Sequence, residues 1–246
     1  QMLEIGMAEL GILEAEENRD RIVRYLKILR EECIRETNLI NDLLDLSRLD
    51  SDTEPLILST LNLQYWIPHI TESFIERTRN QQQHLLIEIP PELPSFTTDF
   101  TYLDLVLTEL LHNACKYTPL GETIRISAQE IQQPSSEPNL LHALAQSPTS
   151  NSNPGFQEAL ALNVWVQLTV SNSGVEISPN ELHAVFDKFH RVPNSDPWKH
   201  GGTGLGLALV KKRVARLQGG ITAMSQDNWT WFTIQLPCLA ASEMPE

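Results

Sequence analysis

Residues 109–119 read Glu109-Leu110-Leu111-His112-Asn113-Ala114-Cys115-Lys116-Tyr117-Thr118-Pro119. They end a segment, Thr101 to Tyr117, whose apolar residues recur at helical spacing and predict an amphipathic helix. Glu109, Asn113 and Lys116 are spaced by four and three residues, so their side chains share one face of that helix. A carboxylate, an amide and an ammonium on one face suit a nucleotide with its metal ion, although an ordinary solvated helix face fits the same spacing.

Each of these groups has chemistry that a nucleotide site requires. The Asn113 amide oxygen is a hard ligand for Mg²⁺, the Lys116 ammonium can meet phosphate, and the Glu109 carboxylate can accept a proton. Tyr117 at the helix end can lie against a purine ring. The stretch therefore predicts a site for a nucleotide and Mg²⁺, with Asn113 as the metal ligand.

A second motif, Gly201-Gly202-Thr203-Gly204-Leu205-Gly206, opens a predicted helix, Leu205 to Leu217. Glycines at the start of a helix let the backbone approach a phosphate closely, and the free N–H groups face that anion. Lys188, Lys199 and His200 add cations nearby. A dinucleotide-binding fold requires a strand directly before the glycines, and the polar segment Pro193 to Lys199 stands there instead, which excludes that fold.

Together these motifs resemble the ATP-binding domain of sensor histidine kinases, which is shared with gyrase-type topoisomerases, Hsp90 and MutL. Glu109 to Pro119 resembles the asparagine-bearing box, and Gly202 to Gly206 resembles the second glycine box. The first glycine box corresponds to Asn172-Ser173-Gly174-Val175-Glu176-Ile177, and the phenylalanine box to Phe186-Asp187-Lys188-Phe189. Upstream, Asn41-Asp42-Leu43-Leu44-Asp45-Leu46-Ser47-Arg48 resembles the end of the second helix of the kinases' dimerisation hairpin. Four motifs in this order make the resemblance specific.

The resemblance implies an ATP-dependent protein-histidine kinase core. Such a core transfers the γ-phosphate of ATP to a histidine, from which an aspartate of a response regulator takes it. Glu109 is then the general base, Asn113 the Mg²⁺ ligand and Lys116 a phosphate contact. The other residues implied in nucleotide binding are Tyr117, Asn172, Gly174, Ile177, Lys188, Arg191, Gly202, Thr203, Gly204, Leu205 and Gly206. His112 and His190 adjoin this site and receive no catalytic role.

The sequence departs from the family pattern at three places. Asn172 stands where the family has an aspartate that accepts a hydrogen bond from the adenine amino group, and a neutral amide accepts that bond about 1 kcal/mol less favourably. Glu176 replaces a glycine of the same box, so we expect its bulk and negative charge near the nucleotide, where they weaken ATP binding. The first histidine of the chain is His69, so the phosphoacceptor is expected upstream of Gln1.

Residues 1–52 are expected to form a helical hairpin. Two helical segments are separated by a polar break at Glu16-Glu17-Asn18, and the second carries a heptad pattern. Its a and d positions are Ile22, Leu26, Leu29, Cys33, Glu36, Ile40 and Leu43. The apolar stripe is too wide for one partner helix. It therefore favours a homodimeric four-helix bundle over packing of both helices against the rest of the chain.

Residues 53–240 are expected to form the ATP-binding domain, behind a linker from Ser51 to Pro55. Strand-like and helix-like segments alternate there, which predicts an α+β fold with helices on one face of a mostly antiparallel sheet. The expected helices are Pro68–Asn80, Thr101–Tyr117, Asn180–Phe186 and Leu205–Leu217, and the expected strands are Leu85–Ile89, Thr123–Ala128, Val164–Val170, Ile221–Met224 and Trp231–Leu236. Residues 130–157 are rich in Pro, Ser, Asn and Gln and predict a mobile surface insertion.

The composition narrows the class of protein. The chain has 246 residues, a formal net charge of -14 and a pI near 4.9. Such a field repels phosphate backbones and anionic lipid, which argues against nucleic acid as a partner. Three scattered cysteines fit neither a disulfide framework nor a zinc site and indicate a reducing, cytoplasmic setting. No apolar run is long enough to span a membrane, so no direct membrane contact is expected from this segment.

Two other functions remain open on the sequence alone. A nucleotide-binding pseudo-kinase that serves as a dimeric scaffold is consistent with Asn172, Glu176 and the absent phosphoacceptor. An ATPase of the gyrase or Hsp90 type is disfavoured by the helical segment in front and by the ending Lys116-Tyr117-Thr118-Pro119. Binding of ATP and transfer to a histidine substrate would separate these functions.

Overall fold

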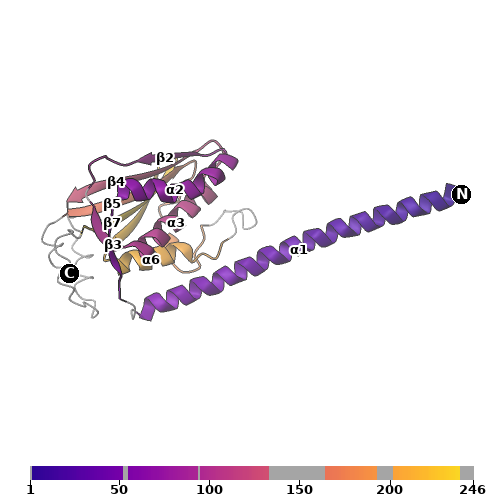
Figure 1. The fold of residues 1–246 in the computed structure, drawn as a ribbon, viewed down its shortest axis with the longest axis horizontal. Helices are drawn as coiled ribbons and strands as arrows, with labels where there is room; N and C mark the ends of the chain where they lie inside the picture. The colour runs from indigo at the N-terminus through magenta and orange to yellow at the C-terminus, as the bar shows by residue number, and fades with distance from the viewer. Residues whose placement is uncertain (1, 52–54, 94, 133–163, 193–201, 239–246) are drawn as a thin grey trace. The chain divides into compact units, whose positions relative to one another are not determined.

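The computed structural model describes residues 2–51, 55–93, 95–132, 164–192 and 202–238, and for residues 2–18 and 20 it describes the backbone alone. Tertiary contacts divide the chain into two compact units, Gln1–Leu44 and Asp45–Glu246. The first unit is helical, and the second contains the sheets and the other helices (Figure 1). A helical N-terminal region and an α+β class agree with the sequence prediction.

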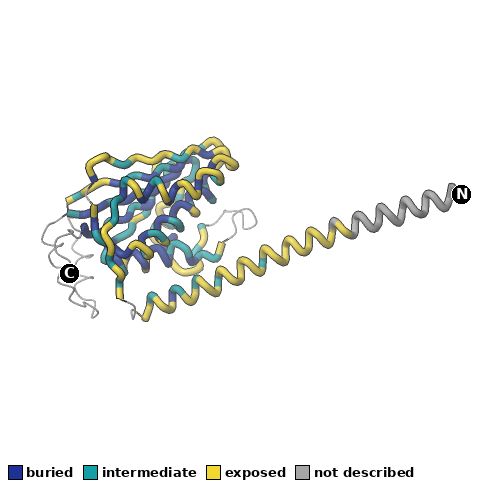
Figure 2. The backbone as a smooth tube through the Cα atoms, viewed as in Figure 1, coloured by how far each residue is buried: buried dark blue, intermediate teal, exposed yellow. Residues whose placement is uncertain are grey.

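Helix α1, Met2–Ser51, continues without interruption through the position of the expected hairpin turn. The prediction of a two-helix hairpin in residues 1–52 is therefore wrong. Glu16 and Glu17 are strong helix formers, a single Asn18 does not end a helix, and the segment contains no proline. The expected heptad positions are exposed, among them Leu26 at 61% and Leu29 at 60% (Figure 2). The described part of α1 thus presents an apolar stripe that its own unit does not cover.

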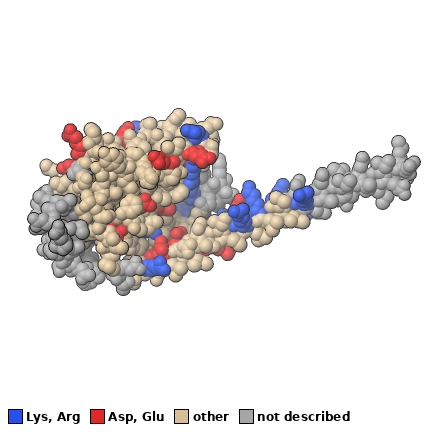
Figure 3. All heavy atoms as spheres, viewed as in Figure 1, with Lys and Arg blue, Asp and Glu red and all other residues tan. Residues whose placement is uncertain are grey.

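The same helix carries a cluster of basic residues. Arg19, Arg21, Arg24, Lys27 and Arg30 are all exposed, and Figure 3 shows Lys and Arg atoms gathered along this helix. This local charge is opposite in sign to the net charge of -14 of the whole chain. Within the described residues, no helix combines the length and the apolar content that a membrane crossing requires.

The second unit is built on a five-stranded sheet with the strand order β2-β4-β5-β7-β6. Strand β2 (His84–Glu88) runs parallel to β4 (Thr123–Gln132). The other neighbours are antiparallel: β4 with β5 (Val164–Ser173), β5 with β7 (Trp229–Pro237), and β7 with β6 (Gly220–Gln226). A separate two-stranded sheet pairs β1 (Leu58–Leu61) with β3 (Phe96–Asp99). The mostly antiparallel sheet is as predicted, whereas β1 and β3 are not among the predicted strands.

Three helices cover one face of the large sheet, as Figure 1 shows: α2 (Leu63–Asn80), α3 (Phe100–Tyr117) and α6 (Gly206–Arg216). Alternate residues of the central strands are buried beneath them, such as Ile124 and Ile126 of β4, while Arg125 between them is partly exposed. An antiparallel sheet with one packed face and one solvated face gives this alternation. The alternation of apolar and polar residues in these strands therefore identifies the face of the sheet that the helices cover.

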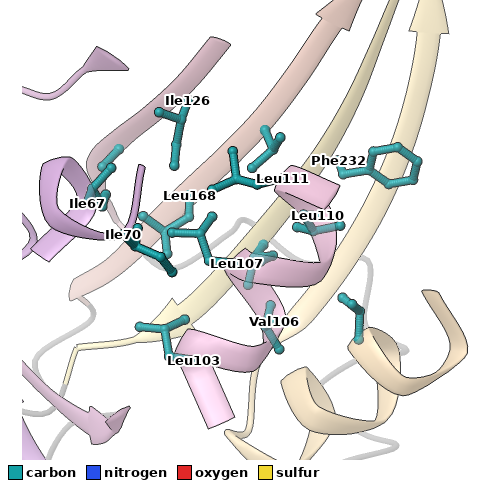
Figure 4. Close-up of a cluster of buried hydrophobic side chains, with 14 of the residues drawn as sticks. Ile67, Ile70, Leu103, Val106, Leu107, Leu110, Leu111, Ile126, Leu168 and Phe232 are labelled. Atoms are coloured by element: carbon teal, nitrogen blue, oxygen red, sulfur yellow. The ribbon is translucent and has the colours of Figure 1, made fainter. Parts of the chain in front are cut away.

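Helix α3 lies at the centre of the core. Its buried leucine and valine residues, each at most 1% exposed, are Leu103, Val106, Leu107, Leu110 and Leu111. Figure 4 shows them packed toward Ile126 and Leu168 of the sheet. Burial of each such side chain stabilises the fold by about 1.5–3 kcal/mol. The Asp99 side chain caps the helix by accepting a hydrogen bond from the Tyr102 N–H at 3.1 Å. The helix is therefore packed against the core along one side and capped at its start.

Several element boundaries differ from the prediction. Helix α2 begins ahead of Pro68 because the Asn62 side chain accepts a hydrogen bond from the Gln64 N–H at 3.0 Å and caps it. The expected helix Asn180–Phe186 is reduced to a 3₁₀ turn, η1 (Ala184–Phe186). Strand β4 continues to Gln132 and so includes the first residues of the expected insertion at 130–157. The remainder of that insertion lies outside the described residues.

The last turns of α1 belong to the second unit and are fixed to α6. Leu46 is buried, with 3% of its surface exposed. The Arg213 guanidinium of α6 donates to Asp45 Oδ2 at 2.7 Å, and the Arg213 side chain is only 8% exposed. Lys212 pairs with Asp50 one turn farther along. The change from one unit to the other thus falls inside a helix.

Candidate functional site

Glu109, Asn113 and Lys116 lie on α3, and all three are partly buried. The Asn113 Nδ2 donates to Glu109 Oε1 at 3.3 Å, which agrees with the predicted common face. The Lys116 Nζ lies 4.6 Å from the centre of the Tyr117 ring. One side of α3 therefore carries a carboxylate, an amide and an ammonium in succession, with an aromatic ring at the helix end.

The second glycine box packs directly on this face of α3. A Cβ atom built on Gly206, the first residue of α6, would overlap the Glu109 carboxylate. A Cβ atom on Gly202 would lie 2.7 Å from the Lys116 Nζ. Only glycine therefore leaves room at position 206 with Glu109 in its present place. Two motifs that are far apart in the sequence meet here, as the predicted nucleotide site requires.

The residues between these glycines hold the start of α6. Leu205 is fully buried, and its N–H donates to Thr203 Oγ1 at 3.2 Å. This hydrogen bond occupies one of the N–H groups that a helix start leaves free. The glycine-rich segment is thus anchored at its α6 end by Leu205.

The phenylalanine box supports the second glycine box. The Phe189 N–H donates to the Gly204 carbonyl at 2.9 Å, and the Phe186 ring packs edge-on against Phe232 at 6.2 Å. Lys188 turns toward Asp50, with 3.5 Å between Nζ and Oδ2, so the structure does not bring it to the α3 face. Arg191 is exposed. The cations Lys199 and His200 that the sequence suggested lie outside the described residues.

The first glycine box packs against the end of α3. Gly174 has a φ of 82°, and a Cβ atom there would lie 2.8 Å from Pro119 Cδ, so glycine is required on both counts. Asn172, at the end of β5, is 4% exposed. The partly buried Ile177 is fixed by its N–H, which donates to Ser225 Oγ at 2.9 Å. The box thus connects the end of the central strand β5 to the helix that carries the other site residues.

Glu176 of the first glycine box has a partner outside that box. Its carboxylate accepts a hydrogen bond from the Asn228 N–H in the turn between β6 and β7. The side chain is thus engaged by the neighbouring hairpin, and the expected crowding of the nucleotide by Glu176 stays a prediction. The replacement of a glycine by glutamate serves the β6–β7 turn and adds a link between this turn and the box.

The two histidines near the motifs have structural partners. The His112 ring packs edge-on against Phe74 of α2 at 4.9 Å, and its Nδ1 accepts a hydrogen bond from Arg77 Nη1 at 2.7 Å. Burial, with the Arg77 charge second, lowers the pKa of His112. His112 precedes Asn113 in the chain, but its ring contacts α2, which agrees with the structural role expected for it. His190 Nε2 lies 2.6 Å from Glu181 Oε2.

One supporting residue has no marker in the sequence. The buried Gln83 amide donates from Nε2 to the Cys115 carbonyl at 3.0 Å and to the Thr118 carbonyl at 2.6 Å. These carbonyls belong to the last turn of α3 and would otherwise lack partners. Gln83 thus fixes the helix end next to Lys116, although a glutamine within a polar run gives no indication of this.

The donor set fits Mg²⁺ better than a metal held by the protein alone. Among the described residues, no group of three or more His, Cys, Asp or Glu side chains could hold a metal ion. Mg²⁺ commonly takes one or two protein oxygens and completes its shell with water and substrate phosphate. The Asn113 amide, which donates to Glu109 Oε1 and keeps its oxygen as an acceptor, suits that mode of binding.

Comparison with known proteins gives a consistent assignment. A family model described as histidine kinase-, DNA gyrase B-, and HSP90-like ATPase matches residues 98–240, which contain all four motifs. The chain is 29% identical over 222 residues to the sensor histidine kinase WalK of Bacillus subtilis, covering 90% of this chain and 31% of WalK. It is 30% identical over 224 residues to hybrid signal transduction histidine kinase D of Dictyostelium discoideum, covering 90% of this chain and 13% of that protein. The chain thus spans less than a third of either relative.

Solved structures agree on the fold. Full-length ShkA in complex with AMPPNP superimposes with a TM-score of 0.66 at 20% identity, over 89% of this chain and 39% of that one. The histidine kinase ThkA in complex with the response regulator TrrA gives a TM-score of 0.62 at 19% identity, over 89% of this chain and 52% of that one. The predicted fold class is therefore confirmed.

Proposed function

Because the chain belongs to the histidine kinase-, DNA gyrase B-, and HSP90-like ATPase family, we propose that it is the ATP-dependent catalytic core of a two-component histidine kinase. The observation that carries this proposal is the contact of Glu109 on α3 with Gly206 at the start of α6. This contact brings the Glu109 carboxylate, which can accept a proton, next to the second glycine box, whose backbone can approach a phosphate closely. The names of the relatives support histidine as the acceptor class.

The residues of α3 divide the tasks of phosphoryl transfer. Lys116 contacts the phosphates, and the helix start at Gly206 adds a favourable field for their negative charge. Glu109 accepts the proton that the attacking imidazole loses. Asn113 would hold Mg²⁺ through its amide oxygen, and the ion would neutralise charge on the phosphates. We place the adenine base of ATP between Tyr117 and the first glycine box, in contact with Asn172, Gly174 and Ile177.

The remaining nucleotide contacts come from the segment between the phenylalanine box and α6. The members of this group are Lys188, Arg191, Gly202, Thr203, Gly204 and Leu205. Arg191 is exposed and could contact a phosphate of the bound nucleotide. Lys188 would have to leave its ion pair with Asp50 to do so, and an exposed ion pair costs little to break.

We place the acceptor histidine on a helical segment that precedes residues 1–51, which contain no histidine. The phosphoryl group then passes to an aspartate of a response regulator. The resemblance to ThkA, which was solved with the response regulator TrrA, supports this partner. An ATP-dependent reaction and free thiols at Cys33, Cys115 and Cys238 are consistent with a cytoplasmic location.

The exposed apolar stripe of α1 supports a homodimer. Ile22, Leu26, Leu29 and Ile40 are each at least 57% exposed, and exposure of such a stripe to water is unfavourable. A second copy of α1 supplies a stripe of the same shape and chemistry, as symmetric association requires. Light scattering of the protein is expected to give about twice its mass of 27.8 kDa.

Nucleotide binding is tested by calorimetry with a non-hydrolysable ATP analogue and Mg²⁺. The Asn113→Ala variant should lose most of the Mg²⁺-dependent part of the binding, since alanine offers no ligand oxygen. Asn80→Ala, at an exposed asparagine at the end of α2, is the matched control and should bind as the unmodified protein does. No binding at millimolar analogue would refute the proposal.

Transfer is tested with labelled ATP and the protein extended upstream through its acceptor histidine. An acid-labile, base-stable phosphoprotein is expected. Glu109→Gln should slow its formation by about 100- to 10,000-fold while ATP still binds, because the amide cannot take the proton. Absence of label in the extended protein, with ATP binding intact, would instead support the pseudo-kinase scaffold.

A further inference from the structure

Asn172 is the last of the alternate residues of strand β5 that are buried on the helix-covered face of the sheet. Along this strand Val166, Leu168 and Val170 alternate into the core, and each is at most 1% exposed. Asn172 occupies the next position of the same row and is 4% exposed. An amide thus takes the place of an aliphatic side chain where the strand ends and the first glycine box begins.

The Asn172 Nδ2 is buried and has no hydrogen-bond partner in the described part of the chain. The hydroxyl groups around this strand end are engaged elsewhere. Thr230, the register neighbour of Asn172 on β7, donates to the Val175 carbonyl at 2.9 Å, and Ser173, the next residue of β5, donates from Oγ to the Glu122 carboxylate. A buried donor without a partner is unfavourable, so the site favours a ligand that supplies an acceptor.

The chemistry of an amide differs from that of a carboxylate at this point. An ionised aspartate can only accept hydrogen bonds, whereas an asparagine both donates and accepts. A half-turn of the amide about its last side-chain bond exchanges Nδ2 and Oδ1 in nearly the same space. Asn172 can therefore meet the 6-amino group of adenine through Oδ1 or the 6-oxo group of hypoxanthine and guanine through Nδ2.

We propose that the nucleotide site accepts 6-oxopurine nucleotides as well as ATP, and that Asn172 is the residue that determines this. The inference rests on the proposed function, in which Asn172 faces the base. With an aspartate at this position, a 6-oxo oxygen would meet a charged acceptor and leave both groups unpaired. Sites built in that way reject the mismatched ligand strongly. Asn172 carries no charge and can donate to the 6-oxo oxygen, so this cause of rejection does not apply to it.

The test compares MgATP, MgITP and MgCTP, each as a competitor of a fluorescent ATP analogue bound to the protein. ITP carries the 6-oxo group without the 2-amino group of GTP, so it isolates the contact at carbon 6. CTP retains the triphosphate and measures binding without a purine. We expect a dissociation constant for ITP within about tenfold of that for ATP, and binding of CTP at least tenfold weaker than ITP, on the order of one lost hydrogen bond.

The Asn172→Asp variant provides the decisive comparison. It should bind ATP as well as or better than the unmodified protein, and it should raise the ratio of the ITP to the ATP dissociation constant by at least about 30-fold. An unchanged ratio would overturn the inference. ITP as weak as CTP in the unmodified protein would do the same while leaving the proposed function in place. Failure of all three nucleotides to compete would refute the proposed function itself.

A second variant covers the case in which a buried carboxylate prevents folding. Asn172→Ala removes the donor and the acceptor together, so ATP and ITP should weaken by similar factors and their ratio should change less than about threefold. A loss confined to ATP would show that Asn172 acts only as an acceptor, and the inference would then fail.

Discussion

Helices α1 and α3 carry similar apolar patterns in opposite surroundings. Leu107 and Leu111, one turn apart on α3, are fully buried, whereas Leu26 and Leu29, one turn apart on α1, are 61% and 60% exposed. Helix α3 faces a sheet and two further helices of its own unit, and no described residue of the first unit covers α1. Apolar spacing therefore reports that a helix needs a partner, and it does not report whether the same chain provides one.

The largest expected effect concerns the uncovered helix. Leu29→Glu places a charge without a partner in the proposed α1–α1 interface of each subunit, which should raise the dimer dissociation constant at least about 100-fold. Light scattering across a dilution series measures this constant. Leu120→Glu, at a leucine that is 70% exposed outside α1, is the matched control and should leave the constant unchanged. An intact Leu29→Glu dimer would mean that the stripe of α1 is not the interface.

A substitution in the buried face of α3 should lower the free energy of unfolding of the second unit. Leu107→Ala removes a fully buried side chain at the centre of the core and should lower the free energy of unfolding by about 3 kcal/mol. Urea denaturation followed by tryptophan fluorescence reports on the second unit, because all five tryptophans lie beyond residue 60. Leu29→Ala is the control and should leave this transition unchanged. Equal losses of unfolding free energy in both variants would show that α1 and α3 contribute alike to the stability of the second unit.

The attachment of the last turns of α1 to α6, within the second unit, should give a smaller effect. Asp45→Asn weakens the hydrogen bond to Arg213, a guanidinium that is nearly buried, and should cost about 1 kcal/mol of unfolding free energy. The same denaturation measurement applies. Asp50→Asn, in the exposed pairs with Lys212 and Lys188, should produce no measurable change. A larger loss for Asp50 than for Asp45 would show that burial of the partner does not determine the strength of these contacts.

The contact of α3 with α2 should show a modest pH dependence. The folded protein lowers the pKa of His112, so the unfolded chain binds more protons as the pH falls through the ordinary histidine range. Stability should therefore decrease between about pH 7.5 and pH 5.5. His112→Asn, which keeps an acceptor for Arg77 but does not titrate, should show a smaller decrease in the urea midpoint. An identical pH profile would place the dependence on other histidines.

Much of the second unit could be predicted from the sequence. Helix α3 and the alternating strands β4, β5 and β7 have long periodic patterns, and packing agrees with them. Strands β1 and β3 have four residues each and are rich in Ser and Thr, so their pairing depends on tertiary contact that no local pattern encodes. The supposed break in α1 rested on polarity alone, and polar helix formers do not end a helix.

The candidate site was predictable where spacing on one element was enough. Glu109 and Asn113 are four residues apart on one helix, and they contact each other as expected. Lys188 and Glu176 were assigned through their place in a motif, but their side chains pair with Asp50 and with Asn228, which lie far away in the sequence. A motif locates a backbone segment reliably, while the direction of each side chain depends on neighbours that only the fold brings close.

The strand order has a consequence for how the protein is made. Strand β5, which carries Asn172, lies between β4 and β7 in the sheet, and Asn172 is paired in register with Ile124 and Thr230. A ribosome must therefore synthesise the chain through Pro237, the last residue of β7, before β5 acquires its second neighbour. Until then β5 is an edge strand with unpaired backbone groups, a form that is prone to associate with other chains. The large sheet of the second unit therefore stays incomplete until nearly the whole domain has been synthesised.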